Sequence, residues 1–171
     1  LKYVFNVVHS INQNLNKYKI IVTKSTVPVG TGDQIEKILN SKKNKNKFCV
    51  LSNPEFLREG EAIRDFLYPD RVVVGTNSKK ANNIIKDLYM PIIKKKNRYF
   101  QTSRRAAELI KYASNAFLAT KISYINEIAN LCEKSNIDIK EVSSGIGLDQ
   151  RIGGRFLRAG PGYGGSCFPK D

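Results

Sequence analysis

KIIVTKSTVPVG, residues 19–30, is the segment from which the fold of this chain follows most directly. Its β-branched apolar run is the pattern of a buried strand, and a polar segment with a proline comes directly after it. Similar apolar runs recur at 48–52 (FCVLS), 71–75 (RVVVG) and 98–102 (RYFQT), with helical patterns between them. Continuously apolar strands that alternate with helices predict an α/β fold, in which helices cover both faces of a parallel sheet.

Three helices are expected beside these strands. Apolar side chains repeat at helical spacing between Tyr3 and Leu15. Thr31 is placed to cap a second helix, and Ser78 to cap a third that Pro91 ends. The expected apolar faces are Ile35, Ile38 and Leu39 in the second helix, and Ala81, Ile84, Ile85 and Leu88 in the third.

The chain changes character after Thr102. Residues 104–135 contain neither Pro nor Gly, and their apolar side chains keep a period near ~3.6. This predicted stripe consists of Leu109, Ala113, Phe117, Tyr124, Ile128 and Leu131 or Cys132. A shorter helix is expected from Asp138 to just before Gly145. We therefore predict two domains, an α/β part over 1–102 and a mostly helical part over 103–171.

The chain is strongly basic, because 29 Lys and Arg against 15 Asp and Glu give it a net charge of +14. This charge raises the alternative of a nucleic-acid-binding module. However, the basic runs at 40–47 and 94–98 lie between apolar segments, where solvated loops are expected, and aromatic residues do not alternate with them as a stacking surface needs. We favour a general attraction to anionic ligands such as nucleotides, without a nucleic-acid partner.

Composition narrows the setting further. Hydrophobic residues make up 41% of the chain, as in globular proteins, and no apolar run approaches the ~18 residues of a membrane span. Cys49, Cys132 and Cys167 have no metal-like spacing, so neither a disulfide framework nor a metal site is expected. The simplest expectation is a reducing, cytoplasmic setting without a membrane partner.

Polar segments follow the apolar runs where open α/β sheets bind ligands, beyond the carboxyl ends of parallel strands. KSTVPVG follows the first run and NPEFLREG, at 53–60, follows the second. The loop after the third run is expected to face the same crevice. Pro28 or Pro54 alone would only mark a turn, but two polar segments at equivalent positions favour a ligand site.

Two further residues carry candidate chemistry. Lys111 shares a helix face with Asn115, and its ammonium either reaches solvent along the apolar stripe or faces the crevice, where it could stabilise an oxyanion. Cys167 lies among glycines just before Pro169, which is well placed as the first residue of a helix. A helix N-terminus and the nearby Lys170 would both favour the thiolate form of this cysteine.

The chain resembles the UDP-glucose/GDP-mannose dehydrogenase family in five segments, which are STVPVGT, NPEFLREG, PDRVVVG, ELIKYASNAFLATKISYINEIA and GYGGSCFPKD, in this order. The resemblance extends from Ile20 to Asp171. It implies the C-terminal half of a Rossmann-like NAD-binding domain followed by a mostly helical central domain. PGYGGSCFPKD favours the UDP-glucose branch of the family, and the GDP-mannose branch stays open as the alternative.

The family oxidises the C6 alcohol of a nucleotide sugar to a carboxylate with two NAD⁺, through a thiohemiacetal and a thioester on a cysteine. The catalytic residues that the resemblance implies are Cys167 as nucleophile, Lys111 with Asn115 for the oxyanion-like intermediates, Glu55 as base for thioester hydrolysis, and Thr26 and Asp171 for water and proton transfer. The implied cofactor contacts are Ser25, Glu59 and Lys170. The implied substrate contacts are Phe56, Leu57, Phe156, Arg158, Gly164 and Arg151, the last across a homodimer interface.

The resemblance also leads us to expect an internal piece of a longer protein. The family's GxGxxG loop precedes these motifs and is not in this sequence, and VGTG, at 29–32, follows the wrong strand with the wrong spacing. The chain starts with Leu1, and its only methionine is Met90. We expect the chain alone neither to bind NAD nor to turn over substrate.

Overall fold

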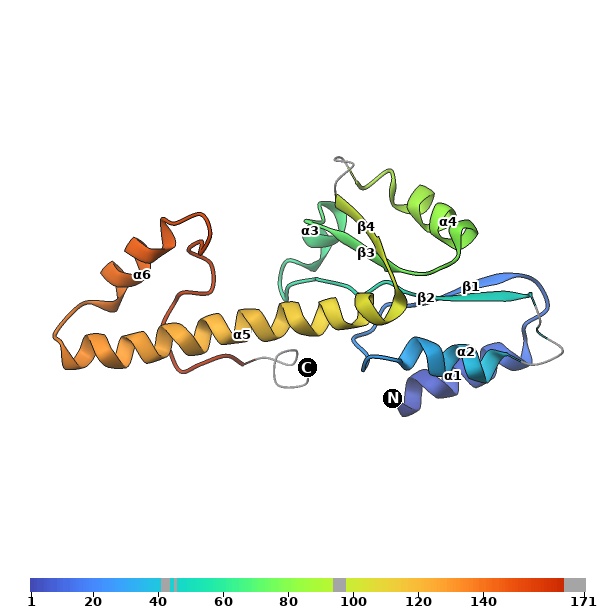
Figure 1. The fold of residues 1–171 in the computed structure, drawn as a ribbon, viewed down its shortest axis with the longest axis horizontal. Helices are drawn as coiled ribbons and strands as arrows, with labels where there is room; N and C mark the ends of the chain where they lie inside the picture. Colours follow the sequence, from blue (N-terminus) through green and yellow to red (C-terminus); the bar gives the residue numbers. More distant parts are fainter. Residues whose placement is uncertain (41–43, 45, 94–97, 165–171) are drawn as a thin grey trace. The chain divides into compact units, whose positions relative to one another are not determined.

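A computed structural model describes residues 1–40, 44, 46–93 and 98–164. The chain forms two compact units, Leu1–Lys111 and Tyr112–Asp171 (Figure 1). The first unit holds a sheet with helices around it, and the described part of the second is made of helix and loop.

Four strands form one sheet in the order β1 (Lys19–Thr23), β2 (Phe48–Ser52), β3 (Val72–Gly75) and β4 (Tyr99–Thr102). β1 runs parallel to β2, and β3 runs parallel to β4. β2 and β3 are antiparallel and share one residue pair, Ser52 opposite Gly75. The predicted α/β fold is confirmed, but the sheet is only mostly parallel, because β3 and β4 run against β1 and β2.

The reversed direction of β3 corrects one prediction about the site. After β3 the chain turns back beside β2, since Oγ1 of Thr76 lies 3.9 Å from Sγ of Cys49. The segments after β1 and β2 therefore leave the sheet at one edge, and the segments after β3 and β4 leave it at the other. The expectation that the loop after the third apolar run faces their crevice is wrong, because an apolar pattern carries no information on strand direction.

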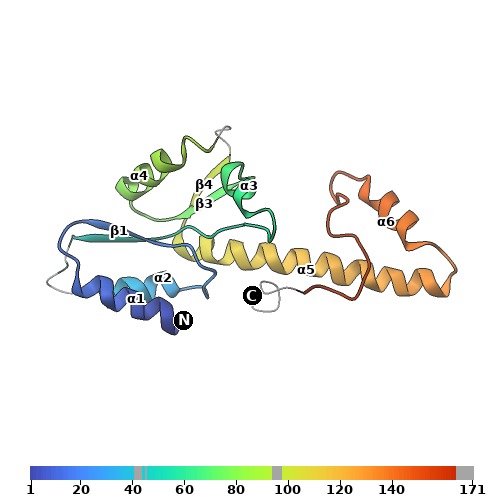
Figure 2. The same ribbon diagram turned by 180° about the vertical axis from the view of Figure 1, so that it is seen from behind.

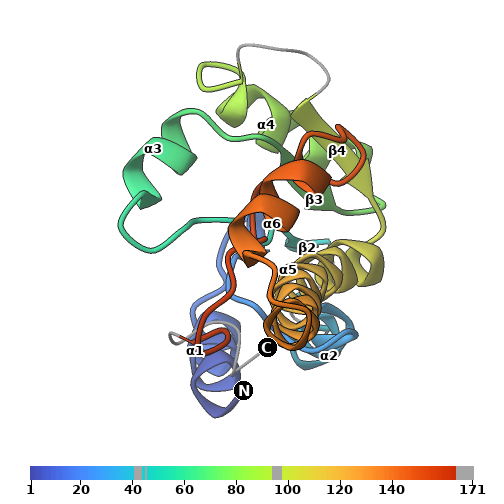
Figure 3. The same ribbon diagram turned by 90° about the vertical axis from the view of Figure 1, so that its left-hand side faces the viewer.

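Helices cover both faces of the sheet, with α1 (Lys2–Gln13) and α2 (Thr31–Leu39) on one side and α4 (Lys79–Tyr89) on the other (Figures 1 and 3). Their buried cores are Val8, Ile35, Leu39 and Val50 on the first side, and Leu51, Val72, Val74, Ala81, Ile85 and Ile93 on the second. The predicted cap of α4 is confirmed, because Oγ of Ser78 accepts from N of Ala81. The predicted apolar face of α4 is too wide, because Ile84 and Leu88 are exposed.

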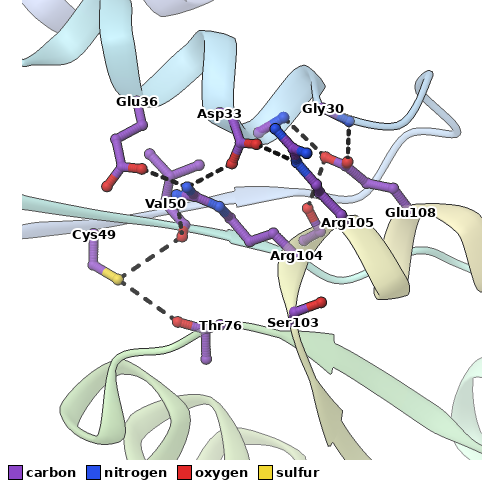
Figure 4. Close-up of polar contacts among 12 residues, drawn as sticks. Gly30, Asp33, Glu36, Cys49, Val50, Thr76, Ser103, Arg104, Arg105 and Glu108 are labelled. Atoms are coloured by element: carbon purple, nitrogen blue, oxygen red, sulfur yellow. Dashed lines mark hydrogen bonds and ion pairs between the residues drawn. The ribbon is translucent and has the colours of Figure 1, made fainter.

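One long helix, α5 (Arg104–Lys134), begins in the first unit and ends in the second. The long helix expected from the sequence is confirmed. Its first turn packs closely on β3, where a Cβ added to Gly75 would lie 2.6 Å from the Cβ of Ala107. Arg104 also pairs with Asp33 of α2 at 2.7 Å (Figure 4). These contacts attach the start of α5 to both the sheet and α2, and the close approach explains the glycine.

The first turn of α2 is not capped as predicted. Gly30, at φ 93°, occupies the N-cap position, and the hydroxyl of Thr31 donates to O of Pro28. The N–H of Gly30 donates to the carboxylate of Glu108 in α5 at 2.7 Å (Figure 4). The N–H of Gly32 donates to the same carboxylate at 2.8 Å. A carboxylate far away in sequence thus replaces a local cap, which spacing rules cannot reveal.

The short helix α3 (Ala62–Leu67) is absent from the sequence-based prediction. Arg58 binds the carboxylate of Asp65 through its backbone N–H at 2.9 Å and its guanidinium at 2.6 Å. These hydrogen bonds lower the pKa of Asp65 to about 2. Six residues are too few to show a helical period, so the sequence pattern does not predict α3. The structure shows it through these local contacts.

The second unit contains the later turns of α5, then α6 (Ile139–Gly147) and a loop (Figure 2). The predicted start of α6 is confirmed, because the side chain of Asp138 accepts from N of Lys140. The helix continues past Gly145, so its predicted end is wrong. The predicted apolar stripe of α5 is largely exposed at Leu109, Phe117, Tyr124 and Leu131, whereas Ile125 and Cys132 are buried. Within the described ranges, no helix has the length and apolar character needed to cross a bilayer.

Candidate active site

A buried lysine lies at the edge of the sheet where β1 and β2 end. Lys111 is 5% exposed, and its Nζ lies 3.4 Å from Oε1 of Glu55 in the segment after β2. This burial excludes the alternative in which the ammonium extends into solvent. A poorly solvated ammonium interacts strongly with nearby negative charge, so Lys111 can stabilise an anion that forms beside it.

The backbone of the NPEF segment orients the partner of this lysine. Oε2 of Glu55 accepts from the backbone N–H of Leu57 at 2.7 Å, which directs Oε1 to Lys111. Glu55 is partly buried, and Leu57 is exposed at 38%. The carboxylate can therefore reach both the lysine and a group outside the sheet edge.

The ring of Phe56 contacts two cations. The guanidinium of Arg71 lies 3.9 Å from the ring centroid, and Nζ of Lys111 lies 5.5 Å from it. Burial lowers the pKa of Arg71, and the charge of Asp70 opposes this effect. Cation–π contacts of this kind help to hold the segment after β2 against Lys111. Arg71 was not predicted as a site residue, because nothing near it in the sequence marks its contact with Phe56.

A small hollow lies beside Lys111. Its walls include Ser25 and Thr26 from the segment after β1, Pro54 from the segment after β2, and Glu108 from α5. The structure thus brings Ser25, Thr26 and Lys111 together, with Glu55 paired to the lysine. Both polar segments meet here, as expected for the carboxyl ends of neighbouring parallel strands.

Glu108 belongs to this site and was missed in the sequence analysis. It is 3% exposed, and its carboxylate accepts from Ser52 Oγ at 3.2 Å as well as from Gly30 and Gly32. A buried carboxylate needs such partners to offset the loss of water. The spacing could have predicted this residue, because Glu108 lies three residues before Lys111 and therefore shares a face of α5 with it.

The remaining predicted residues near this edge differ in exposure. Glu59 is exposed in the segment between β2 and α3. Asn115 lies one turn beyond Lys111 on α5 and is buried. The shared face of Lys111 and Asn115 therefore follows from the continuous helix.

The second unit contains a separate cavity of about 530 Å³ between α6 and the segment that follows it. Arg158 lines this cavity, and Phe156 nearby has a φ of 66°, which is unusual for a residue with a side chain. Arg151 is exposed and pairs with Asp149 at 2.6 Å, a hydrogen bond that raises the pKa of the arginine. Gly164 is exposed at the end of the described loop.

Contacts with α5 hold this loop in the second unit. Nζ of Lys121 donates to O of Ile152 at 2.9 Å, and N of Gly160 donates to Oδ1 of Asn126 at 2.9 Å. Three other predicted residues, Cys167, Lys170 and Asp171, lie outside the described residues. Over the ranges that the structure describes, no group of three or more His, Cys, Asp or Glu side chains could hold a metal ion.

The fold and this cluster define an α/β domain with a lysine–carboxylate pair at the strand ends, which continues into a long helix. Residues 1–93 match the NAD binding domain of the UDP-glucose/GDP-mannose dehydrogenase family, and residues 105–171 match the family's central domain. The chain belongs to the UDP-glucose/GDP-mannose dehydrogenase family. The resemblance seen in the sequence motifs is confirmed.

Individual relatives agree with this assignment. A UDP-glucose 6-dehydrogenase of Rickettsia prowazekii is 54% identical over 171 residues, which are 100% of this chain and 39% of that protein. The structure of a UDP-glucose dehydrogenase from the archaeon Pyrobaculum islandicum superimposes with a TM-score of 0.92 at 40% identity, over 99% of this chain and 40% of the other. A GDP-mannose dehydrogenase from Pseudomonas aeruginosa superimposes with a TM-score of 0.78 at 31% identity, over 99% and 40%. The chain spans about two fifths of the length of these relatives.

Proposed function

We propose that this chain forms part of the catalytic centre of a UDP-glucose 6-dehydrogenase, which oxidises UDP-glucose to UDP-glucuronate in two NAD-dependent steps. The observation that carries this proposal is the 54% identity to such an enzyme across the whole chain. The buried pair of Lys111 and Glu55 at the sheet edge supports it. GDP-mannose is the alternative substrate. It has less support, because this chain is only 31% identical to a GDP-mannose dehydrogenase.

The groups after β1 and β2 fit a nicotinamide dinucleotide, which α/β folds bind across the carboxyl ends of parallel strands. Ser25 is exposed at this edge and offers a hydroxyl, and the exposed carboxylate of Glu59 is an acceptor for sugar hydroxyls. We assign both residues, with Lys170, to cofactor binding. NAD⁺, when bound, supplies the hydride acceptor for each oxidation.

Lys111 would stabilise the negative oxygen that develops during thiohemiacetal formation and thioester hydrolysis. Its ammonium is buried, so a charge close to it is weakly screened. Asn115, one turn further along α5, would hydrogen-bond the same oxygen. The sulfur of Cys167 would add to the C6 aldehyde to form the thiohemiacetal, which the second oxidation converts to the thioester.

Glu55 would then act as the base for hydrolysis. It would accept a proton from the water that attacks the thioester, while the leaving sulfur of Cys167 regains its thiolate. Thr26 and Asp171 would hold that water or carry protons. Thr26 lies in the wall of the hollow beside Lys111, which supports this role.

The sugar-nucleotide contacts that we propose follow the family resemblance, residue by residue. Phe56 and Leu57 would contribute backbone groups, and the segment from Phe156 to Gly164 would surround the uridine and phosphates. Arg158 supports this assignment, because it lines the cavity of the second unit. Arg151 would reach a neighbouring subunit of a homodimer.

We make three broader proposals, on the domain boundary, the oligomeric state and the cellular setting. The domain boundary lies near Thr102, between the two matched segments 1–93 and 105–171. The protein is a homodimer, which the exposed apolar side chains along α5 support. Its setting is cytoplasmic.

The test uses a complete enzyme. Residues 1–171 replace the 171 aligned residues of the Rickettsia prowazekii relative, and this chimera receives UDP-glucose or GDP-mannose with excess NAD⁺. We expect two NADH for each UDP-glucose. One NADH per sugar would remove the thioester step and the covalent role of Cys167. Turnover of GDP-mannose without turnover of UDP-glucose would assign the chain to the other branch.

A further inference from the structure

Three polar side chains form hydrogen bonds with one another on the sheet face that α4 covers. Oδ1 of Asn53 accepts from Nζ of Lys24 at 3.0 Å and from OH of Tyr89 at 2.6 Å. Nζ of Lys24 also donates to OH of Tyr89 at 3.0 Å. We call Lys24, Asn53 and Tyr89 the back cluster. Its members come from the ends of β1 and β2 and from the end of α4.

The alternation of side chains along the strands places this cluster opposite the candidate site. Ile20 and Val22 of β1 pack toward α4, so Lys24 continues their side. Leu51 packs there too, and Asn53 continues the side of Leu51. Residues of the other parity line the hollow beside Lys111 on the opposite face, namely Thr23, Ser25 and Ser52. None of the described residues that line this hollow belongs to the back cluster.

Asn53 also joins the two halves of the sheet. Its Nδ2 donates to O of Val73 in β3 at 2.8 Å, and its backbone N–H donates to O of Thr23 at 2.9 Å. The backbone pairing between β2 and β3 is a single residue pair, so this side-chain bond adds a link where the ladder is shortest. Asn53 is 2% exposed, and its side-chain donor and acceptor are both satisfied.

The two segments that leave this cluster carry the proposed site. Ser25 and Thr26 directly follow Lys24, and Glu55 lies two residues after Asn53. We infer that the back cluster is a positioning device, which sets the spacing between the segment with Thr26 and the segment with Glu55 from the far face of the sheet. This inference rests on the proposed function, because it assigns the spacing to catalysis.

The test compares matched substitutions in the chimera. Tyr89→Phe deletes one oxygen from the cluster, and Tyr3→Phe makes the same change at a side chain that is 83% exposed. We measure kcat and KM for UDP-glucose per folded enzyme, well below the melting temperature. Since a 1 Å misplacement can cost about a hundredfold in rate, we expect Tyr89→Phe to lower kcat about tenfold with KM changed less than about threefold. Tyr3→Phe should leave both unchanged.

A lower melting temperature with kcat equal to the parent would reduce the back cluster to a stability element and overturn the inference. A second pair of variants tests the member of the back cluster that follows β1. Lys24→Met is compared with its control, Lys134→Met at an exposed position. If Lys24→Met does not fold, Tyr89→Phe still decides, because it keeps the ring and its packing.

If the parent chimera oxidises neither sugar nucleotide, the proposed function is rejected, but the positioning role is still open to test. Amide hydrogen exchange then tests the positioning role, because it does not require enzyme activity. We expect Tyr89→Phe to raise the amide exchange rates of residues 25–27 and 55–57 about tenfold relative to Tyr3→Phe, while α1 stays protected. Equal exchange in both variants would overturn the positioning role.

Discussion

Glu108 connects three elements of the first unit through one side chain. Its carboxylate accepts from the first turn of α2 and from Ser52 at the end of β2, while its backbone belongs to α5. A negative charge is favourable at a helix N-terminus, and a buried charge is stable only when its partners are present. The residue thus serves stability directly and orients the helix that carries Lys111.

Replacing this charge should destabilise the fold. Glu108→Gln places an NH₂ group against backbone N–H donors, so we expect the free energy of unfolding to fall by about 2 kcal/mol, in the range for hydrogen bonds to charged groups. Urea unfolding of the chain measures the change. Glu133→Gln, at an exposed position near the end of α5, is the control and should cost under about 0.5 kcal/mol. Equal effects at the two positions would contradict the capping role.

Among the described residues, Lys111 is the one on which the proposed chemistry depends most. In the chimera, Lys111→Met keeps much of the apolar stem but removes the ammonium, so we expect kcat to fall by about 10² or more. The exposed Lys134→Met should retain the parent rate. Steady-state NADH formation measures both variants. Parent-like turnover in Lys111→Met would remove the lysine from the proposed mechanism.

Single elements depend on contacts that sequence periodicity does not show. α3 is held by Arg58 and Asp65, and the first turn of α5 lies directly on Gly75 of β3. In both cases, a local pattern sets the type of structure, and one specific contact sets its position.

The ion pair at α3 should respond to acid in a defined direction. Hydrogen bonds from Arg58 lower the pKa of Asp65 from 3.8 to about 2, so the folded state favours the carboxylate. Its contribution to stability is therefore present above pH 3.8 and is lost as the pH falls through about 2. An NMR titration of the Asp65 carboxyl carbon measures this value. Arg58→Met should return the midpoint toward 3.8, and an unchanged midpoint would show that the ion pair has no effect.

The contact between β3 and α5 should tolerate no side chain. Gly75→Ala would place a Cβ 2.6 Å from that of Ala107, and we expect overpacking to cost about 1–3 kcal/mol of unfolding free energy. Gly145→Ala is the matched control, since nothing lies within 4 Å of the added Cβ inside α6. That change should stabilise by up to about 1 kcal/mol, because alanine favours helix. Urea unfolding measures both, and a Gly75→Ala variant as stable as the parent would contradict the close packing.

At the scale of the whole molecule, the excess of positive charge is the dominant electrostatic feature. The net charge of +14 over 171 residues already counts both members of each ion pair, so the ion pairs leave this excess unchanged. Mutual repulsion of like charges destabilises a compact chain, and salt screens it.

Salt should therefore stabilise this chain. Raising NaCl from about 0.01 to 0.15 M shortens the Debye length from about 30 to 8 Å, and we expect the melting temperature to rise by about 2–4 °C. A variant with four exposed lysines changed to glutamine should show a smaller rise. These lysines are Lys2, Lys79, Lys86 and Lys134. A melting temperature that falls with salt would mean that specific ion pairs outweigh the net repulsion.

Local patterns were sufficient for much of this protein. The apolar runs and helical periods predicted the α/β class, the four strands and the long helix, because continuous β-branched runs favour buried strands and a period of 3.6 residues follows from helix geometry. The motifs KSTVPVG and NPEFLREG located the segments that carry Thr26 and Glu55, since polar residues after buried strands mark the ligand edge of such sheets.

Tertiary structure alone decided the remaining features. The reversal of β3, the capping of α2 by Glu108, and the contact of Arg71 with Phe56 all join residues that lie far apart in sequence. The sequence allowed Lys111 to be either exposed or buried. In the structure it is buried, and it pairs with Glu55 of the segment after β2. The physical reason is common to these cases: a residue's own pattern sets its local conformation, whereas its partners are set by how distant segments pack together.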